Sequence, residues 1–200
     1  MRKIALAAGL FLAAASTALA ATADTKRMVL GLSDLPAGFT VEKGRYVDNR
    51  AAARQTTNQS QAKSLADYKR WGRIMGYERN FEREGLVGAL QVESNASVYK
   101  TAKGATESTR ESFSVATKPN VAGWVFKPVS AGGAIGHEAR VYSTSVKQGG
   151  LDLTVVVVIW RYRTVKASIF AGGFKGTVDA AEIASLARKQ QAKIEAAIRG

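Results

Sequence analysis

The residues of this chain that could do chemistry are few, and they do not form a known catalytic pattern. The sole histidine, His137, precedes Glu138, but a zinc site of the H-E-x-x-H type needs a second histidine where this chain has Val141. No serine lies in a G-x-S-x-G turn, and there is no cysteine. We therefore predict no catalytic residue, no metal site and no cofactor, and we expect a protein that is not an enzyme.

Two short stretches interleave aromatic rings with cations and could bind an anionic ligand. They are "YKRWGR", which contains Tyr68 and Trp71, and "WRYR", which begins at Trp160. Such clusters occur in proteins that bind single-stranded nucleic acid, although cations of this kind are also common on ordinary solvated surfaces. The clusters are candidate binding residues, and the compartment of the protein decides which ligand is plausible.

The first twenty residues have the pattern of a secretory signal peptide. Arg2 and Lys3 precede the apolar stretch "IALAAGLFLAAA", and "ALA" at positions 18–20 fits a cleavage site. We predict a leader at 1–20 and a single domain at 21–200, with a mobile lead-in at 21–29. After cleavage no transmembrane segment is expected, and the protein would be periplasmic or secreted.

The chain carries a formal net charge of +13, which favours anionic partners. An extracytoplasmic location argues against nucleic acid as that partner. Envelope polymers, lipid head groups or another anionic or apolar ligand fit the location better.

The hydrophobic pattern predicts an α+β domain whose helices must hold the candidate binding residues against a sheet. Residues 90–98 alternate between apolar and polar side chains, and "HEARVYSTSV" and "LDLTVVVVIW" flank a "KQGG" turn, as in a β-hairpin. Residues 183–198 repeat apolar side chains at helical spacing. We expect a central antiparallel sheet of about six strands, flanked by helices and closed by an amphipathic C-terminal helix.

The valine-rich run at 153–160 is too short to span a membrane as a helix, and its β-branched residues favour a central strand with both faces covered. We assign every second residue from Leu151 to Ile159 to the face under the C-terminal helix. The other face is the predicted binding surface, unless the helix around Tyr68 and Trp71 closes over it. Its apolar floor would be Val156, Val158 and Trp160, and its rim Arg161, Arg163 and Lys166.

Several short motifs together resemble a known group of proteins. The "DLPAGF" turn, "AIGHEARVY" before a long apolar hairpin, and the ending "IASLARKQQAKI" are similar to small secreted bacterial α/β proteins of the PsbP/Mog1-like type. The resemblance implies an antiparallel sheet flanked by helices, with a binding, assembly or accessory role. It implies no catalytic residues.

Three functions are compatible with these observations. The first is an exported, non-enzymatic binding or accessory module of the cell envelope. The second is a basic protein that adheres to anionic envelope polymers through its net charge. The third is an enzyme of unrecognised type, which would need a deep pocket with converging polar groups.

Overall fold

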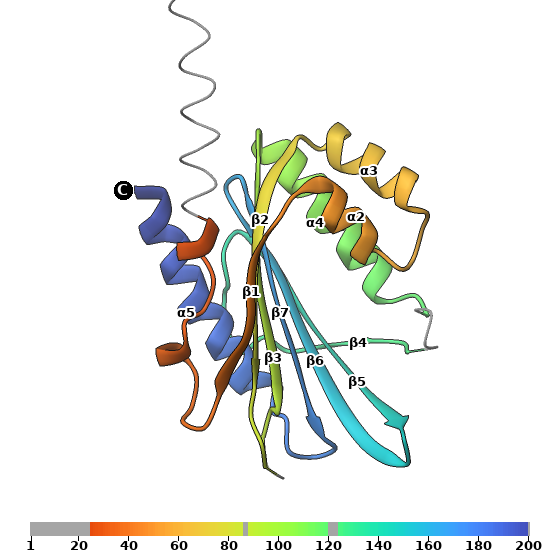
Figure 1. Ribbon diagram of the computed structural model, residues 1–200, viewed down its shortest axis with the longest axis vertical. Coiled ribbons are helices and arrows are strands. Elements are labelled where there is room, and N and C mark those ends of the chain that lie inside the picture. The colour runs from red at the N-terminus through yellow and green to blue at the C-terminus, as the bar shows by residue number, and fades with distance from the viewer. Residues whose placement is uncertain (1–24, 86–87, 120–123, 200) are drawn as a thin grey trace, which may run out of the picture.

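The computed structural model describes residues 25–85, 88–119 and 124–199, and the predicted leader lies outside them. One antiparallel sheet forms the centre of the molecule, with the strand order β1-β2-β3-β7-β6-β5-β4 (Figure 1). The strands are β1 (Thr40–Val47), β2 (Arg73–Glu82), β3 (Gln91–Tyr99), β4 (Lys127–Val129), β5 (Glu138–Gln148), β6 (Leu151–Tyr162) and β7 (Val165–Phe174). The predicted α+β class is confirmed, with seven strands instead of about six.

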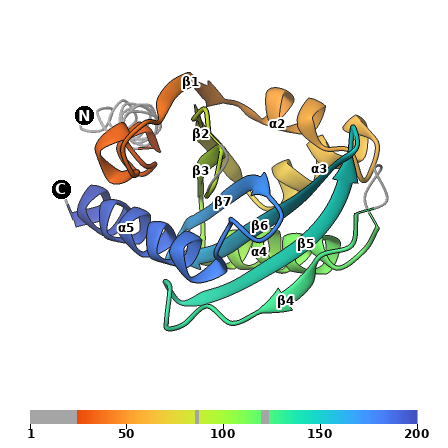
Figure 2. The same cartoon turned by 90° about the horizontal axis from the view of Figure 1, so that it is seen from below.

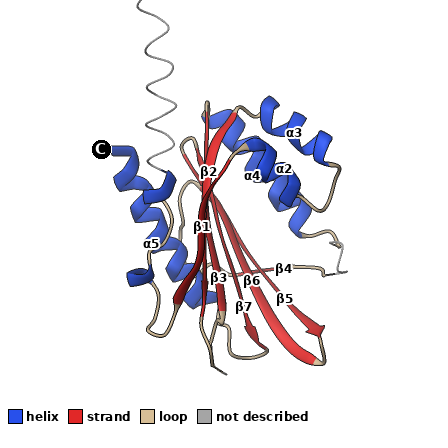
Figure 3. Ribbon diagram, viewed as in Figure 1, coloured by secondary structure: helices blue, strands red, loops and turns tan. Residues whose placement is uncertain are grey.

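Helices cover both faces of the sheet, as Figures 2 and 3 show. The helical elements are η1 (Leu32–Asp34), α2 (Asn49–Gln55), α3 (Gln61–Arg70), α4 (Ala102–Ala116) and α5 (Ala180–Arg199). The long helix α5 packs on β5, β6 and β7 from one side. The helices α2, α3 and α4 lie on the other side, where α4 packs on β3, β6 and β7. None of the described helices combines the length and the apolar character that a membrane span requires.

The main core lies between the sheet and α5. The strand β6 contributes Val156, Val158 and Trp160, and α5 contributes Ile183 and Ile194; all are buried. Trp160 is 0% exposed, and its Nε1 donates a hydrogen bond to Oε1 of Gln191, 2.9 Å away on α5. Val155 and Ile159 on the opposite face are buried as well, so β6 is an interior strand, as predicted.

The structure corrects the predicted facing of β6. Trp160 pairs with Ala167, and Val158 pairs with Ile169, so these four side chains share the face under α5. The register follows from a two-residue turn at Arg163 and Thr164, where Arg163 has a φ of 51°. The residues Leu151, Leu153, Val155, Val157 and Ile159 therefore face α4 and the open side of the sheet, not the C-terminal helix.

The expected mobile lead-in is wrong where the structure describes it. Met28, Val29 and Leu30 are buried in the core beside α5. The Leu30 amide donates to Ser94 Oγ at 3.0 Å, and that hydroxyl donates to Gln190 Oε1 at 2.8 Å. Three apolar residues in a row gain more from burial than they would gain from chain freedom, so this segment forms part of the domain.

Candidate functional site

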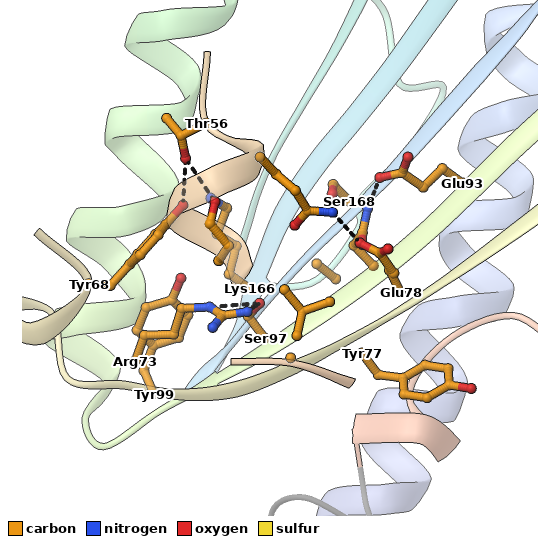
Figure 4. A pocket seen from close by; sticks show the side chains of 16 residues that line it. Thr56, Tyr68, Arg73, Tyr77, Glu78, Glu93, Ser97, Tyr99, Lys166 and Ser168 are labelled. Atoms are coloured by element: carbon orange, nitrogen blue, oxygen red, sulfur yellow. Dashed lines mark hydrogen bonds between the residues drawn. The ribbon is translucent and has the colours of Figure 1, made fainter. Parts of the chain in front are cut away.

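A polar cavity of about 370 Å³ opens between the α2–α3 pair and the sheet (Figure 4). Its walls come from α2, α3 and the end of β1, and its floor from β2, β3 and β7. The floor residues are Arg73, Glu78, Glu93, Asn95, Ser97, Tyr99, Lys166 and Ser168, and Thr56 and Tyr68 lie opposite them. We refer to this space as the polar cavity.

Arg73 is the most deeply placed cation of the polar cavity, with 7% of its surface exposed. Its Nη1 donates to Asn49 Oδ1 at 2.9 Å, and Nε and Nη2 both donate to Ser97 Oγ. Gly76 leaves the necessary space, because a Cβ there would lie 2.5 Å from Nη2 of Arg73. Burial lowers the pKa of Arg73, but a guanidinium remains charged at neutral pH. The guanidinium of Arg73 thus donates to neutral acceptors and lies over the Tyr68 ring, 5.5 Å from its centroid.

Lys166 is the second cation of the polar cavity and points from β7 toward α4. Its Nζ donates to Ser112 Oγ and to the Ser108 carbonyl oxygen, both on α4. Burial and, to a smaller extent, the charge of Arg73 lower the pKa of Lys166 to about 8, against the opposing effect of the charge of Glu111. Within the described ranges, no carboxylate oxygen lies within 4.0 Å of the side-chain nitrogens of Lys166 or Arg73.

The two carboxylates of the polar cavity already have partners. Glu78 accepts hydrogen bonds from Nε of Arg45 and, at 2.8 Å, from Nε2 of Gln55. Glu93 accepts from Nδ2 of Asn95 at 2.6 Å. Tyr99 donates to or accepts from Ser108 Oγ at 2.7 Å, and its burial raises the pKa of the phenol to about 12. The polar cavity therefore contains engaged carboxylates, neutral phenols and two cations without a carboxylate partner.

An apolar cavity of about 410 Å³ adjoins the polar cavity and shares Lys166 and Tyr68 with it. Its floor is formed by Val157, Ile159 and Phe170, and its walls include side chains from α4 together with Trp124 and Phe126. Phe113 of α4 packs against Ile159 and Tyr142 and holds the helix above this floor. The space continues past Phe170 into a groove of about 390 Å³, lined by Leu151, Leu153, Val155 and Phe174, which we call the far groove.

The sequence-predicted site residues separate into two groups. Lys166, Tyr68 and Trp71 meet at the cavities, and the rings of Tyr68 and Trp71 lie 6.0 Å apart in a T-shaped arrangement. The predicted floor is wrong, because Val156, Val158 and Trp160 are sealed beneath α5. The predicted helix around Tyr68 and Trp71 lies on the other side of the sheet, where it contacts β2, while α4 packs over β6.

The two remaining rim arginines lie away from the cavities. Arg161 faces the same side as Lys166, with which it pairs across the strands, but its Nη1 donates to the Arg163 carbonyl oxygen. Arg163 is exposed in the turn with its guanidinium over the Tyr162 ring. Neither lines the polar or the apolar cavity.

Arg73, Ser97 and Tyr99 are site residues that sequence reasoning missed. Arg73 ends the "YKRWGR" stretch, but the sequence does not indicate that it begins a strand and turns inward. Ser97 and Tyr99 belong to β3, and Ser97 alternates with Ala96 and Val98, which face the α5 core. The sequence signal for these residues was the row of polar side chains at 93–97, which shares a face of the sheet with Lys166 on the neighbouring strand β7.

No group of three or more His, Cys, Asp or Glu side chains in the described part of the chain is arranged to hold a metal ion. The donors of the polar cavity are cations, hydroxyls and phenols, which suit an anion better than a metal.

The charge of Lys166 should reduce the stability of the fold at neutral pH. We expect Lys166→Met to raise the free energy of unfolding by about 1 kcal/mol at about pH 7, because a partly buried cation without a carboxylate partner is removed. The melting temperature would rise by about 2–4 °C. Thermal unfolding of both proteins measures this difference, and Lys69→Met, at an exposed position on α3, is the matched control.

The advantage of Lys166→Met should depend on pH. Because the folded pKa is about 8 and the ordinary value is 10.5, the unfolded wild-type chain binds more protons than the folded chain between these values. Wild-type stability therefore rises across this window, and the variant's advantage shrinks toward about pH 10. The groups that surround position 166, namely Arg73, Glu111, Tyr68 and Tyr99, are the same in both proteins. A variant that is less stable at neutral pH, or an advantage independent of pH, would contradict this expectation.

Comparison with solved structures finds a similar fold in the crystal structure of the extracellular domain of PknH from Mycobacterium tuberculosis. The TM-score is 0.58 at 14% sequence identity, and the match covers 86% of this chain and 97% of that one. At this identity the likeness concerns the fold alone. No family model and no curated protein matches the chain. The resemblance to PsbP/Mog1-like proteins therefore stays a prediction.

Proposed function

We propose that this chain is an exported, non-enzymatic binding module of the cell envelope. Its ligand would be a small molecule held between α2–α3 and α4, on the sheet face opposite α5. The observation that carries the proposal is the adjoining pair of cavities, one polar and one apolar, which share Lys166 and Tyr68. Each has a volume of about 370–410 Å³, within the range of small-molecule sites.

Two further observations support an extracytoplasmic role. The N-terminal sequence has the pattern of a secretory leader, and the similar fold belongs to an extracellular domain. The main competing proposal is adhesion to an anionic envelope polymer through the net charge of +13. The two proposals differ in where the ligand binds, since a polymer would contact exposed cations and not the floor of a cavity.

The dye 1-anilinonaphthalene-8-sulfonate tests the proposal directly. We expect the folded protein to bind one equivalent with enhanced dye fluorescence, because the dye has an apolar body and one sulfonate. Ala116→Trp should fill the apolar cavity, which Ala116 lines at the end of α4, and weaken dye binding about tenfold or more. The dissociation constant is measured by fluorescence titration, with circular dichroism to verify folding.

Ala181→Trp is the matched control, because Ala181 is exposed on α5 at the opposite face of the sheet. It should leave dye binding unchanged. Equal binding by both variants, combined with a steep loss of binding as salt is added, would favour adhesion through surface charge and contradict the cavity proposal.

A further inference from the structure

We infer that the cavities bind an anionic amphiphile, whose acidic head group contacts Arg73 and Lys166 and whose apolar tail follows β6. This inference rests on the proposed function and specifies the ligand of the same site. The head group would carry carboxylate or phosphate oxygens. Its tail would be an acyl or alkyl chain, because the space beyond the cations is apolar.

The head group follows from the two cations. Arg73 and Lys166 line one cavity, and their side chains donate hydrogen bonds to neutral acceptors on Asn49, Ser97, Ser108 and Ser112. Charged groups in a partly dry site are stabilised strongly by an opposite charge. The hydroxyl of Ser97, which accepts from Arg73, borders the same space and can donate to an anion (Figure 4). Among the described residues, neither cation is paired with a carboxylate, so an acidic ligand would supply that partner.

The carboxylates of the site do not favour a cationic ligand. Glu78 is already bound by Arg45 and Gln55, and Glu93 by Asn95. Glu111 lines the apolar cavity and attracts Lys166, but it makes no hydrogen bond with that ammonium and is exposed to solvent. Water therefore screens the charge of Glu111 more than it screens the charges of Arg73 and Lys166.

The tail path follows from the corrected facing of β6. Leu151, Leu153, Val155, Val157 and Ile159 form one row on the face away from α5. At about 3.3 Å per residue, this row is roughly 26 Å long, which suits an extended chain. Phe170 and Trp124 line both the apolar cavity and the far groove, so the two spaces follow one another along the row.

The cation Lys166 and the apolar row of β6 lie in the order that an amphiphile with an acidic head group requires. Lys166 is the cross-strand partner of Arg161, and the next residue of the row, Ile159, is the partner of Ser168. Lys166 thus stands directly beyond the Ile159 end of the row. At the other end Leu151 is 53% exposed, so a tail longer than the cavity can extend into the far groove.

A head-group series with a constant tail tests the inference. Laurate and dodecyl phosphate should displace the naphthalene dye at concentrations below their micelle thresholds, while dodecyltrimethylammonium should not. Acetate, which has the head group alone, should also fail. The difference between laurate and dodecyl phosphate then identifies which acid the site prefers, and calorimetric titration measures each affinity.

Variants separate head-group recognition from general apolar binding. Lys166→Met should weaken laurate binding about 10- to 100-fold, the typical effect of a lost charge-assisted hydrogen bond. Lys69→Met should change it less than about twofold, because this exposed residue lines neither cavity. Leu153→Asn in the far groove should weaken laurate more than hexanoate, because only the longer tail reaches it.

The outcomes are distinguishable from those of the proposed function. If the dye binds in the cavity but laurate binds no better than dodecyltrimethylammonium, the anionic ligand is wrong and the binding module stands. Equal laurate affinity in Lys166→Met and wild type would also overturn the inference. If Ala116→Trp leaves both dye and laurate binding intact, both proposals fail.

Discussion

Replacing Trp160 with alanine is expected to reduce the free energy of unfolding by about 3–5 kcal/mol, the usual cost of truncating a buried tryptophan. The indole is 0% exposed beneath α5, and its N–H is hydrogen-bonded to Gln191. Truncation leaves a cavity between β6 and α5 and an unpaired amide oxygen. Urea-induced unfolding followed by circular dichroism measures the loss.

Trp160→Phe is the control for this prediction, since it retains a ring in the core and removes only the hydrogen-bond donor and part of the volume. We expect a loss of about 1–2 kcal/mol. Dye and laurate binding by the folded fraction should be unchanged in both variants, because Trp160 lies on the opposite face from the cavities. Normal stability of Trp160→Ala with reduced ligand affinity would instead support the floor that the sequence predicted.

Gly104→Ala is the second large effect, with an expected loss of about 3 kcal/mol. Gly104 lies in the first turn of α4, and a Cβ there would stand 1.9 Å from the carbonyl oxygen of Trp71, which ends α3. Since that neighbour is backbone, α4 must move away from the α3–β2 junction. Thermal unfolding measures the destabilisation, and weaker dye binding should accompany it because α4 is a wall of the apolar cavity.

Gly172→Ala is the control for Gly104→Ala, because it adds the same methyl group at a position where space is available. A Cβ at Gly172 would meet only Cε1 of Phe170, at 3.9 Å, and its φ is not positive. We expect stability within about 1 kcal/mol of the wild type. If Gly104→Ala were equally mild, the contact between α4 and Trp71 would not be as rigid as the packing indicates.

Much of the fold could be predicted because its strands and helices have strong local patterns. The hairpin of β5 and β6 follows from the glycine pair at 149–150, where positive φ values of 57° and 82° form the turn. The stripe of Ile183, Leu186 and Ile194 predicts the buried side of α5. The edge position of β4 follows from Pro128, which has no amide hydrogen to donate.

The facing of β6 could not be predicted reliably, because both of its faces are apolar. A side-chain period of two assigns every residue to a face, but the assignment inverts when the turn is displaced by one residue. The turn was expected within "RYRT", whereas it consists of Arg163 and Thr164 alone. With that turn known, Trp160 pairs with Ala167, and the predicted floor belongs to the core.

Only part of the candidate site could be predicted, because some of its residues come together only through the pairing of strands. Lys166, Tyr68 and Trp71 carry distinctive chemistry, so composition alone marks them. Arg73 and Ser97 gain their role from a contact between β2 and β3 that local sequence does not specify. Such contacts depend on strand order, which requires the whole fold.

The hydrogen bonds from Leu30 to Ser94 and from Ser94 to Gln190 have a consequence for how the chain matures. They join Leu30, Ser94 and Gln190, which a ribosome releases in that order. The apolar sheet face that α5 covers must stay in contact with water or a chaperone until residues 180–199 have emerged. We therefore expect the domain to acquire its final packing only after residues 180–199 have left the ribosome.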